Sequence, residues 1–181
     1  MPLLTSGTPI CPGYRLVVFL GSDQTDYFFP SSFHIMTATF ANFQAQQNAQ
    51  NTIQLNVFKH CYTLIDALKQ NYVDYSIRGH QRSSERGDNV DYHLSAVKDL
   101  KAGICPIDYT IESGKKYHKI IFIDGSGHHS VHCFVNRETG EVYKSASWKS
   151  PAKGVRFDLR LIKDREWLFQ HADWSGGYLY K

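Results

Sequence analysis

One stripe of apolar residues constrains this chain more than any other feature of its sequence. The residues recur at spacings of three and four between Thr52 and Tyr72, and they are Ile53, Val57, Cys61, Leu64, Ile65, Leu68 and Tyr72. Because an α-helix repeats every 3.6 residues, this spacing places them on one side of a helix. The sequence therefore predicts an amphipathic helix of about five turns from Thr52 to Tyr72, and that side must be buried against another layer.

The segments on either side of this helix are more polar. Thr37 to Asn51 is rich in Ala, Gln and Asn with few charges, a composition that fits a helix, a linker or a polar surface segment. Ser76 to Asn89 has almost no apolar residue and contains two glycines, which predicts a mobile loop. Val90 to Leu100 then predicts a short helix, and its inward-facing residues are expected to be Leu94, Val97 and Leu100.

After Gly103 the pattern changes from helical to alternating. Four segments have the composition and length of strands, and they are Ile104–Glu112, Tyr117–Asp124, Ser130–Val135 and Val142–Lys144. Short turn-forming sequences join them in two successive hairpins. The sequence therefore predicts an antiparallel meander in this half of the chain.

The second hairpin contains a glycine turn and a cysteine. Its turn runs from Arg137 to Gly140, where only glycine adopts a left-handed conformation at low cost. In the strand before the turn, alternation places Cys133 on one face together with Val131 and Val135, and His132 on the other. We therefore expect Cys133 to be a buried thiol rather than a reactive one.

The two ends of the chain are less regular. Met1 to Gly13 contains three prolines and two glycines and predicts an irregular arm, and Tyr14 to Leu20 predicts a short strand at a sheet edge. Val155 to Leu161 predicts one further strand. Asp164 is then expected to cap a helix that continues to about Ala172.

These elements predict a single α+β domain over residues 1–181. It comprises the arm at 1–13, a mainly helical part at 14–102 and a β-rich part at 103–181 that ends in a short helix. The antiparallel sheet is expected to pack against the long amphipathic helix and the short C-terminal helix. A length of 181 residues allows one substantial core but not two ordinary domains.

The sequence also predicts a protein that does not enter a membrane. No apolar run reaches the roughly 18 residues of a membrane span, and no basic segment introduces an apolar stretch as in a signal peptide. The four cysteines form no C-x-x-C pair, which is typical of free thiols in a reducing compartment. A cytoplasmic location is the resulting expectation.

Positive charge is concentrated between Lys115 and Arg165. This stretch has eleven Lys or Arg and five Asp or Glu, although the whole chain carries only +3. It contains the predicted binding residues, which are Tyr143, Lys144, Trp148, Lys149, Lys153, Arg156 and Arg160. In proteins that bind single strands, cations follow the phosphates while aromatic rings stack on bases. The alternative is that Trp148 covers the sheet edge as a hydrophobic lid and the lysines are simply solvated.

A group of histidines forms a second candidate site. Asp124, His128, His129 and His132 fall within nine residues and could supply the three or four ligands that zinc needs. Against this, adjacent strand residues point to opposite faces, and no H-E-x-x-H pattern is present. The alternative is an exposed turn that happens to contain histidine. No cofactor is predicted, and zinc stands as the alternative.

Motifs for common enzyme chemistries are missing from the chain. It contains no G-x-x-x-x-G-K-[ST], no G-x-G-x-x-G after a strand and no G-x-S-x-G. Nucleotide hydrolysis, dinucleotide chemistry and α/β-hydrolase chemistry therefore lose their usual signatures. This favours a non-enzymatic protein without excluding an enzyme.

Two neighbouring motifs carry a resemblance to a known group of proteins. They are Thr139-Gly140-Glu141-Val142-Tyr143-Lys144 and the loop Ala146-Ser147-Trp148-Lys149, which continues as Pro151-Ala152-Lys153-Gly154-Val155-Arg156. This hairpin and loop resemble those of small uncharacterised proteins encoded by tailed bacteriophages. The resemblance implies a phage origin, with the bacterial host cytoplasm or the virion as the location. It brings no catalytic residues.

Three functional hypotheses follow from the sequence. The leading one is a non-enzymatic phage protein that binds nucleic acid or an acidic protein surface through the Trp148 loop. The second is a virion structural or assembly protein that forms homo-oligomers, because the N-terminal arm, Tyr27-Phe28-Phe29 and the Gln/Asn-rich segment could meet a neighbouring subunit. The third is a metal-dependent enzyme that uses the histidine group.

Overall fold

The computed structural model describes residues 32–180, with side chains from Phe40 onward. The predictions for Met1–Gly13, Tyr14–Leu20 and Tyr27–Phe29 lie outside the described residues. The elements in chain order are α1 (Ser32–Glu85), α2 (Val90–Lys101), β1 (Asp108–Ser113), β2 (Tyr117–Ile123), β3 (His129–Asn136), β4 (Glu141–Lys144), β5 (Phe157–Asp158), α3 (Ile162–His171) and the 3-10 helix η1 (Gly177–Leu179). The predicted α+β class is confirmed.

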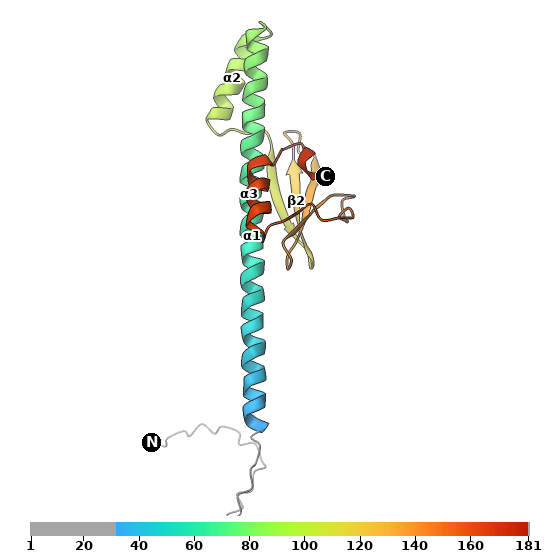
Figure 1. The fold of residues 1–181 in the computed structure, drawn as a ribbon. Coiled ribbons are helices and arrows are strands. Elements are labelled where there is room, and N and C mark those ends of the chain that lie inside the picture. Colours follow the sequence, from blue (N-terminus) through green and yellow to red (C-terminus); the bar gives the residue numbers. More distant parts are fainter. Residues whose placement is uncertain (1–31, 181) are drawn as a thin grey trace, which may run out of the picture.

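Helix α1 is much longer than the stripe predicts. It spans 54 residues, about 80 Å at 1.5 Å per residue. The predicted boundaries at Thr52 and Tyr72 are therefore wrong, and the segment Thr37–Asn51 is helical. Figure 1 shows the sheet beside the middle of α1, with the earlier half of the helix projecting beyond it. No helix within residues 32–180 has both the length and the apolar character to span a bilayer.

The predicted loop at Ser76–Asn89 is also wrong, because α1 continues to Glu85. The chain reverses only at Gly87 and Asn89, where φ is 85° and 33°. Helix α2 then packs along the end of α1 (Figure 1). Apolar residues are therefore needed only on the side of α1 that α2 covers, and the other sides can be polar. The helix predicted at Val90–Leu100 is present and Leu100 is buried, whereas Leu94 is exposed, contrary to the prediction.

The five strands form one antiparallel sheet in the order β1-β2-β3-β4-β5. The meander is therefore confirmed, and the strands pair in simple sequence order. The last strand is shorter than predicted, since only Phe157 and Asp158 pair with β4. Gly140 has a φ of 72°, as expected for the turn between β3 and β4.

The core lies between α1 and one face of the sheet. From α1 it receives Val57, Cys61, Leu64, Ile65 and Leu68, all buried. The facing side chains from the sheet and the C-terminal segment include Tyr109, Ile120, Cys133, Val135, Val142, Phe157 and Leu168. Complete burial of such a side chain contributes roughly 1.5–3 kcal/mol. From Val57 to Leu68 the predicted stripe is therefore the side of α1 that holds the sheet, whereas Ile53 is exposed, contrary to the prediction. The burial of Cys133 is confirmed.

A bulge in β3 changes the direction of His132. On β2, Ile120 pairs with Cys133 but Ile121 pairs with Val131, which leaves His132 as an extra residue. Its ring contacts Tyr109 and Tyr178 of the core side, and Nε2 lies 2.9 Å from the Tyr178 hydroxyl. The predicted placement of His132 on the face opposite Cys133 is therefore wrong, because a bulge interrupts the two-residue repeat.

The C-terminal segment returns across α1. Helix α3 begins at Ile162 after Leu161, so Asp164 lies in the first turn and is not the cap. The Asp164 carboxylate instead accepts a hydrogen bond from the Asp158 amide at 3.3 Å. Further on, the Trp174 ring packs edge-on against Tyr72 of α1 with centroids 5.4 Å apart. This contact fastens the end of the chain to the long helix.

Candidate functional site

The loop after β4 is a tight, internally hydrogen-bonded turn. Ser145 forms a bridge with Pro151, and the amides of Ala146 and Ser147 both donate to the Ser150 carbonyl at 3.1 Å. The Ser147 hydroxyl accepts hydrogen bonds from the amides of Lys149 and Ser150 at 3.3 and 3.2 Å. These bonds hold the residue between them, Trp148, at the tip of the loop.

The Trp148 ring rests on a cation from the sheet. Nζ of Lys119 lies 5.0 Å from the ring centroid, within the range of a cation–π contact. The same ammonium forms a 3.0 Å ion pair with Glu112 on β1. Trp148 keeps 44% of its surface exposed, so it covers part of the sheet and also presents ring surface to solvent. Lys119 was not among the predicted binding residues. The only sign of it in the sequence was the two-residue repeat of the strand, which places Lys119 on the same face as Tyr117.

Aromatic side chains continue the sheet face beside Lys119. Tyr117 packs edge-on against Phe134 and Tyr143, with centroids 6.1 and 5.9 Å apart. The Tyr143 hydroxyl donates a 2.7 Å hydrogen bond to Glu141. This bond to a carboxylate raises the pKa of Tyr143 to about 12. Of the two predicted stacking rings, Trp148 is thus the more exposed and Tyr143 is held against the sheet.

The predicted cations divide into two groups. Lys149 and Lys153 are exposed, and neither forms an ion pair with any residue in the described part of the chain. By contrast, Lys144 places Nζ 3.4 Å from the centroid of the Tyr180 ring, and Arg160 pairs with Asp158 at 3.4 Å. Arg156 is partly buried, with its Nε unpartnered. We use the name Trp148 surface for Lys119, Trp148, Lys149 and Lys153.

The structure separates the histidine group. Asp124 accepts three hydrogen bonds through Oδ1, from the Ser126 amide and hydroxyl and from the His128 amide. These bonds shape an exposed turn and lower the pKa of Asp124. His132 instead points to the core side, where burial lowers its pKa to about 4. Within residues 32–180, no three His, Cys, Asp or Glu side chains come close enough to hold a metal ion.

Cys61 and Cys133 do not form a nucleophilic site either. Cys133 is fully buried and burial raises the pKa of its thiol. Burial likewise raises the pKa of Cys61 to about 12. A thiol that stays protonated and has no exposed surface is a poor nucleophile. The two side chains serve as small apolar residues between α1 and the sheet.

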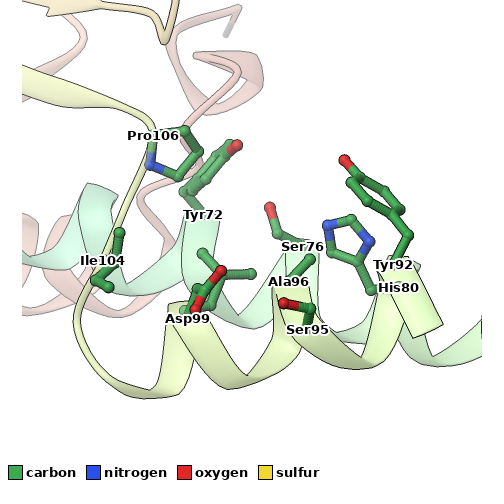
Figure 2. A pocket seen from close by; sticks show the side chains of 10 residues that line it. Tyr72, Ser76, His80, Tyr92, Ser95, Ala96, Asp99, Ile104 and Pro106 are labelled. Carbon is green, nitrogen blue, oxygen red and sulfur yellow. The ribbon is translucent and has the colours of Figure 1, made fainter.

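A cleft of about 300 Å³ opens between α1, α2 and the segment before β1. Figure 2 shows Tyr72 and Pro106 at one end of it and His80 and Tyr92 at the other. His80 also meets His93 of α2, with their Nδ1 atoms 2.8 Å apart. No Lys or Arg lines this cleft, so it lacks the cations that an anionic ligand requires.

A model of DUF7717, described as a family of unknown function, matches residues 40–181. The chain belongs to the DUF7717 family. Comparison with curated proteins and with solved structures finds no match. The DUF7717 match starts at Phe40 and includes the sheet, the Trp148 surface and the cleft between α1 and α2. The family description assigns no activity to the sheet, the Trp148 surface or the cleft.

Proposed function

We propose that this protein binds single-stranded nucleic acid through the Trp148 surface. The observation that carries the proposal is the position of Trp148: a tight loop and Lys119 hold its ring in place while 44% of the residue's surface stays exposed. A ring held in this way loses little conformational freedom when a base stacks on it. Stacking of this kind contributes roughly 1–3 kcal/mol per base.

The charges around the ring favour a polyanion. Lys149 and Lys153 follow Trp148 in the chain and form no ion pair with an acidic residue among the described residues. Each such cation can release a counterion from one phosphate, which makes binding weaken with added salt. An acidic protein surface would use the same lysines but would not need a flat ring. We therefore infer a nucleic-acid strand as the ligand.

The phage resemblance supports the biological setting of the proposal. If the protein is encoded by a tailed bacteriophage, as the motifs around Gly140 and Trp148 suggest, we propose that it acts in the bacterial host cytoplasm or in the virion. Phage strands in replication or packaging would then be the available ligands. No catalytic step is proposed.

Fluorescence anisotropy with a labelled oligothymidylate tests the proposal. We expect binding at low salt that weakens linearly on a log–log plot against salt concentration. Trp148→Ala should raise Kd about 5- to 100-fold, and the double variant Lys149→Ala/Lys153→Ala should reduce the salt slope. The matched control is Lys98→Ala/Lys101→Ala, which removes the same charge from exposed positions of α2.

Three results would contradict the proposal. The first is no binding of the wild-type protein at low salt. The second is binding that the loop variants and the α2 control weaken equally, which would indicate attraction by net charge alone. The third is binding that depends on the lysines but not on Trp148, which would point to a polyanion held without base stacking, such as an acidic protein.

A further inference from the structure

The side of α1 that holds the sheet continues beyond the sheet. Its buried members Val57, Cys61, Leu64 and Leu68 follow spacings of four, three and four. Counting back from Val57, the same alternation reaches Gln54, Gln50, Gln47, Phe43 and Phe40. At 100° per residue these positions all lie within roughly 60° of the direction of Cys61. One continuous face of the helix is thus covered in its middle and uncovered before it.

The uncovered part presents large apolar rings. Phe40 and Phe43 expose 65% and 58% of their surface, and Gln47 and Gln50 are exposed on the same face. Gln54 differs, because its side-chain oxygen accepts a hydrogen bond from Arg137 at 3.4 Å. We call Phe40, Phe43, Gln47 and Gln50 the stalk stripe. Helices pair through residues that recur at spacings of three and four on one side, and the stalk stripe has this spacing with two apolar members, Phe40 and Phe43, followed by two glutamines.

The chemistry of the stalk stripe fits a second copy of the chain. Residues 27–58 contain no Asp, Glu, Lys or Arg, so two copies can approach there without like-charge repulsion. A glutamine amide both donates and accepts hydrogen bonds, so identical glutamines are complementary to each other. A charged partner would find no opposite charge on this part of the helix.

The sheet determines the direction of pairing. Beyond Val57 the same helix face is occupied by the chain's own sheet (Figure 1). In a parallel pair both sheets would need the same space between the helices. In an antiparallel pair the two sheets lie on opposite sides of the crossing point, so they do not compete for the same space.

We infer that two copies of this protein pair through their stalk stripes as an antiparallel helix dimer, crossing near Phe43. At 1.5 Å per residue, the two sheets are then separated by roughly 65 Å along the dimer. The pairing also stabilises the projecting part of α1, where residues 40–50 are uncharged and all exposed, because an isolated helix is only marginally stable in water. This inference rests on α1 and on the sheet that covers its middle, and it is independent of nucleic-acid binding by the Trp148 surface.

Sedimentation and light scattering of the full chain test the association. We expect a dimer whose Kd rises at least about 100-fold in Phe40→Ala/Phe43→Ala. The matched control is Leu55→Ala, which removes an exposed apolar side chain from another side of α1 and should leave the dimer intact. A wild-type monomer at all attainable concentrations, a trimer, or a dimer that both variants affect equally would overturn the inference.

Two substitutions of Phe43 distinguish a loss of apolar packing between the two copies from a loss of folding. Phe43→Leu keeps an apolar side chain and should remain dimeric, whereas Phe43→Glu places a charge near the crossing point and should dissociate the dimer. Both should melt like the wild-type protein when each is measured at the same low concentration, since Phe43 lies away from the core. Equal dimer dissociation constants for Phe43→Leu and Phe43→Glu would contradict the role of Phe43.

Small-angle X-ray scattering tests the direction. An antiparallel dimer gives a pair-distance distribution with a second maximum at roughly 65 Å, from the two separated sheets. A parallel dimer gives one broad maximum because its sheets are adjacent. A dimer with a single maximum would overturn the antiparallel arrangement.

Discussion

The Nζ atom of Lys119, in the middle of β2, lies 5.0 Å from the centroid of the Trp148 ring at the tip of a loop. The same ammonium is held by Glu112 of β1 at 3.0 Å. The rigid sheet thus fixes the position of a ring that the loop presents to solvent. Residues 29 positions apart in the chain act together, and the geometry of the Trp148 surface depends on both.

Replacing Lys119 tests whether the sheet positions the ring. Lys119→Met keeps most of the aliphatic stem but removes the charge that contacts Trp148. We expect oligonucleotide affinity to fall about 3- to 10-fold, because one cation and one support of the ring are lost. Anisotropy measures this change, with Lys98→Met on α2 as the control. Equal affinities for Lys119→Met and the wild-type protein would show that the contact is incidental.

Two Trp→Ala substitutions should differ in their effect on stability. Trp174 packs against Tyr72 and Tyr75, and its amide donates to Asn71 at 3.2 Å. Its removal should lower the free energy of unfolding by about 2–4 kcal/mol. Trp148→Ala should cost less than about 1 kcal/mol, since 44% of the residue's surface already meets solvent. Chemical denaturation compares the two, and a large loss in Trp148→Ala would favour the role of a hydrophobic lid.

Acid should destabilise the fold through His132. Burial lowers the pKa of His132 to about 4 from the ordinary 6.5, although the nearby Asp173 carboxylate offsets part of the effect. Between these values the unfolded chain binds a proton that the folded chain excludes. The free energy of unfolding therefore falls as the pH drops from about 6.5 to about 4, by up to about 3 kcal/mol.

Denaturation across that pH range measures this contribution. His132→Gln should remove part of the slope that the wild-type protein shows, whereas His128→Gln in the exposed turn should not. Some slope will remain in both variants, because burial also lowers the pKa of His118. Identical pH profiles for His132→Gln and the wild-type protein would mean that His132 does not contribute.

Alanine substitution should have opposite effects at two glycines. At Gly140 φ is 72°, and an added Cβ would lie 3.0 Å from Cγ of Arg160. Gly140→Ala should therefore cost about 1–3 kcal/mol. Gly79 lies within α1 with nothing within 4 Å of an added Cβ, so Gly79→Ala should stabilise by about 0.5–1 kcal/mol. Thermal melting compares the two, and stabilisation by both would contradict the turn geometry.

Much of the fold could be predicted because its causes are local. The stripe from Val57 to Leu68 indicated both a helix and its buried side, and alternation after Gly103 indicated the strands of the meander. The conformation at Gly140 followed from the one residue type that adopts it cheaply. Less of the candidate site could be predicted, since Trp148, Lys149 and Lys153 lie within six residues of one loop but Lys119 comes from β2, which is distant in the chain.

The sequence by itself determined that the central part of α1 is helical and which face of it is buried, and it determined the meander order of the strands, because these depend on side-chain periodicity over a few residues. Only the tertiary structure decided that α1 extends from Ser32 to Glu85, that a bulge turns His132 to the core side and that Lys119 supports Trp148. The continuation of α1 to Glu85, the direction of His132 and the support of Trp148 each depend on what packs nearby in space: α2 against the end of α1, Tyr178 beside His132, and the loop folded back over β2. Residues that are neighbours in space but far apart in the chain produce no periodic pattern in the sequence.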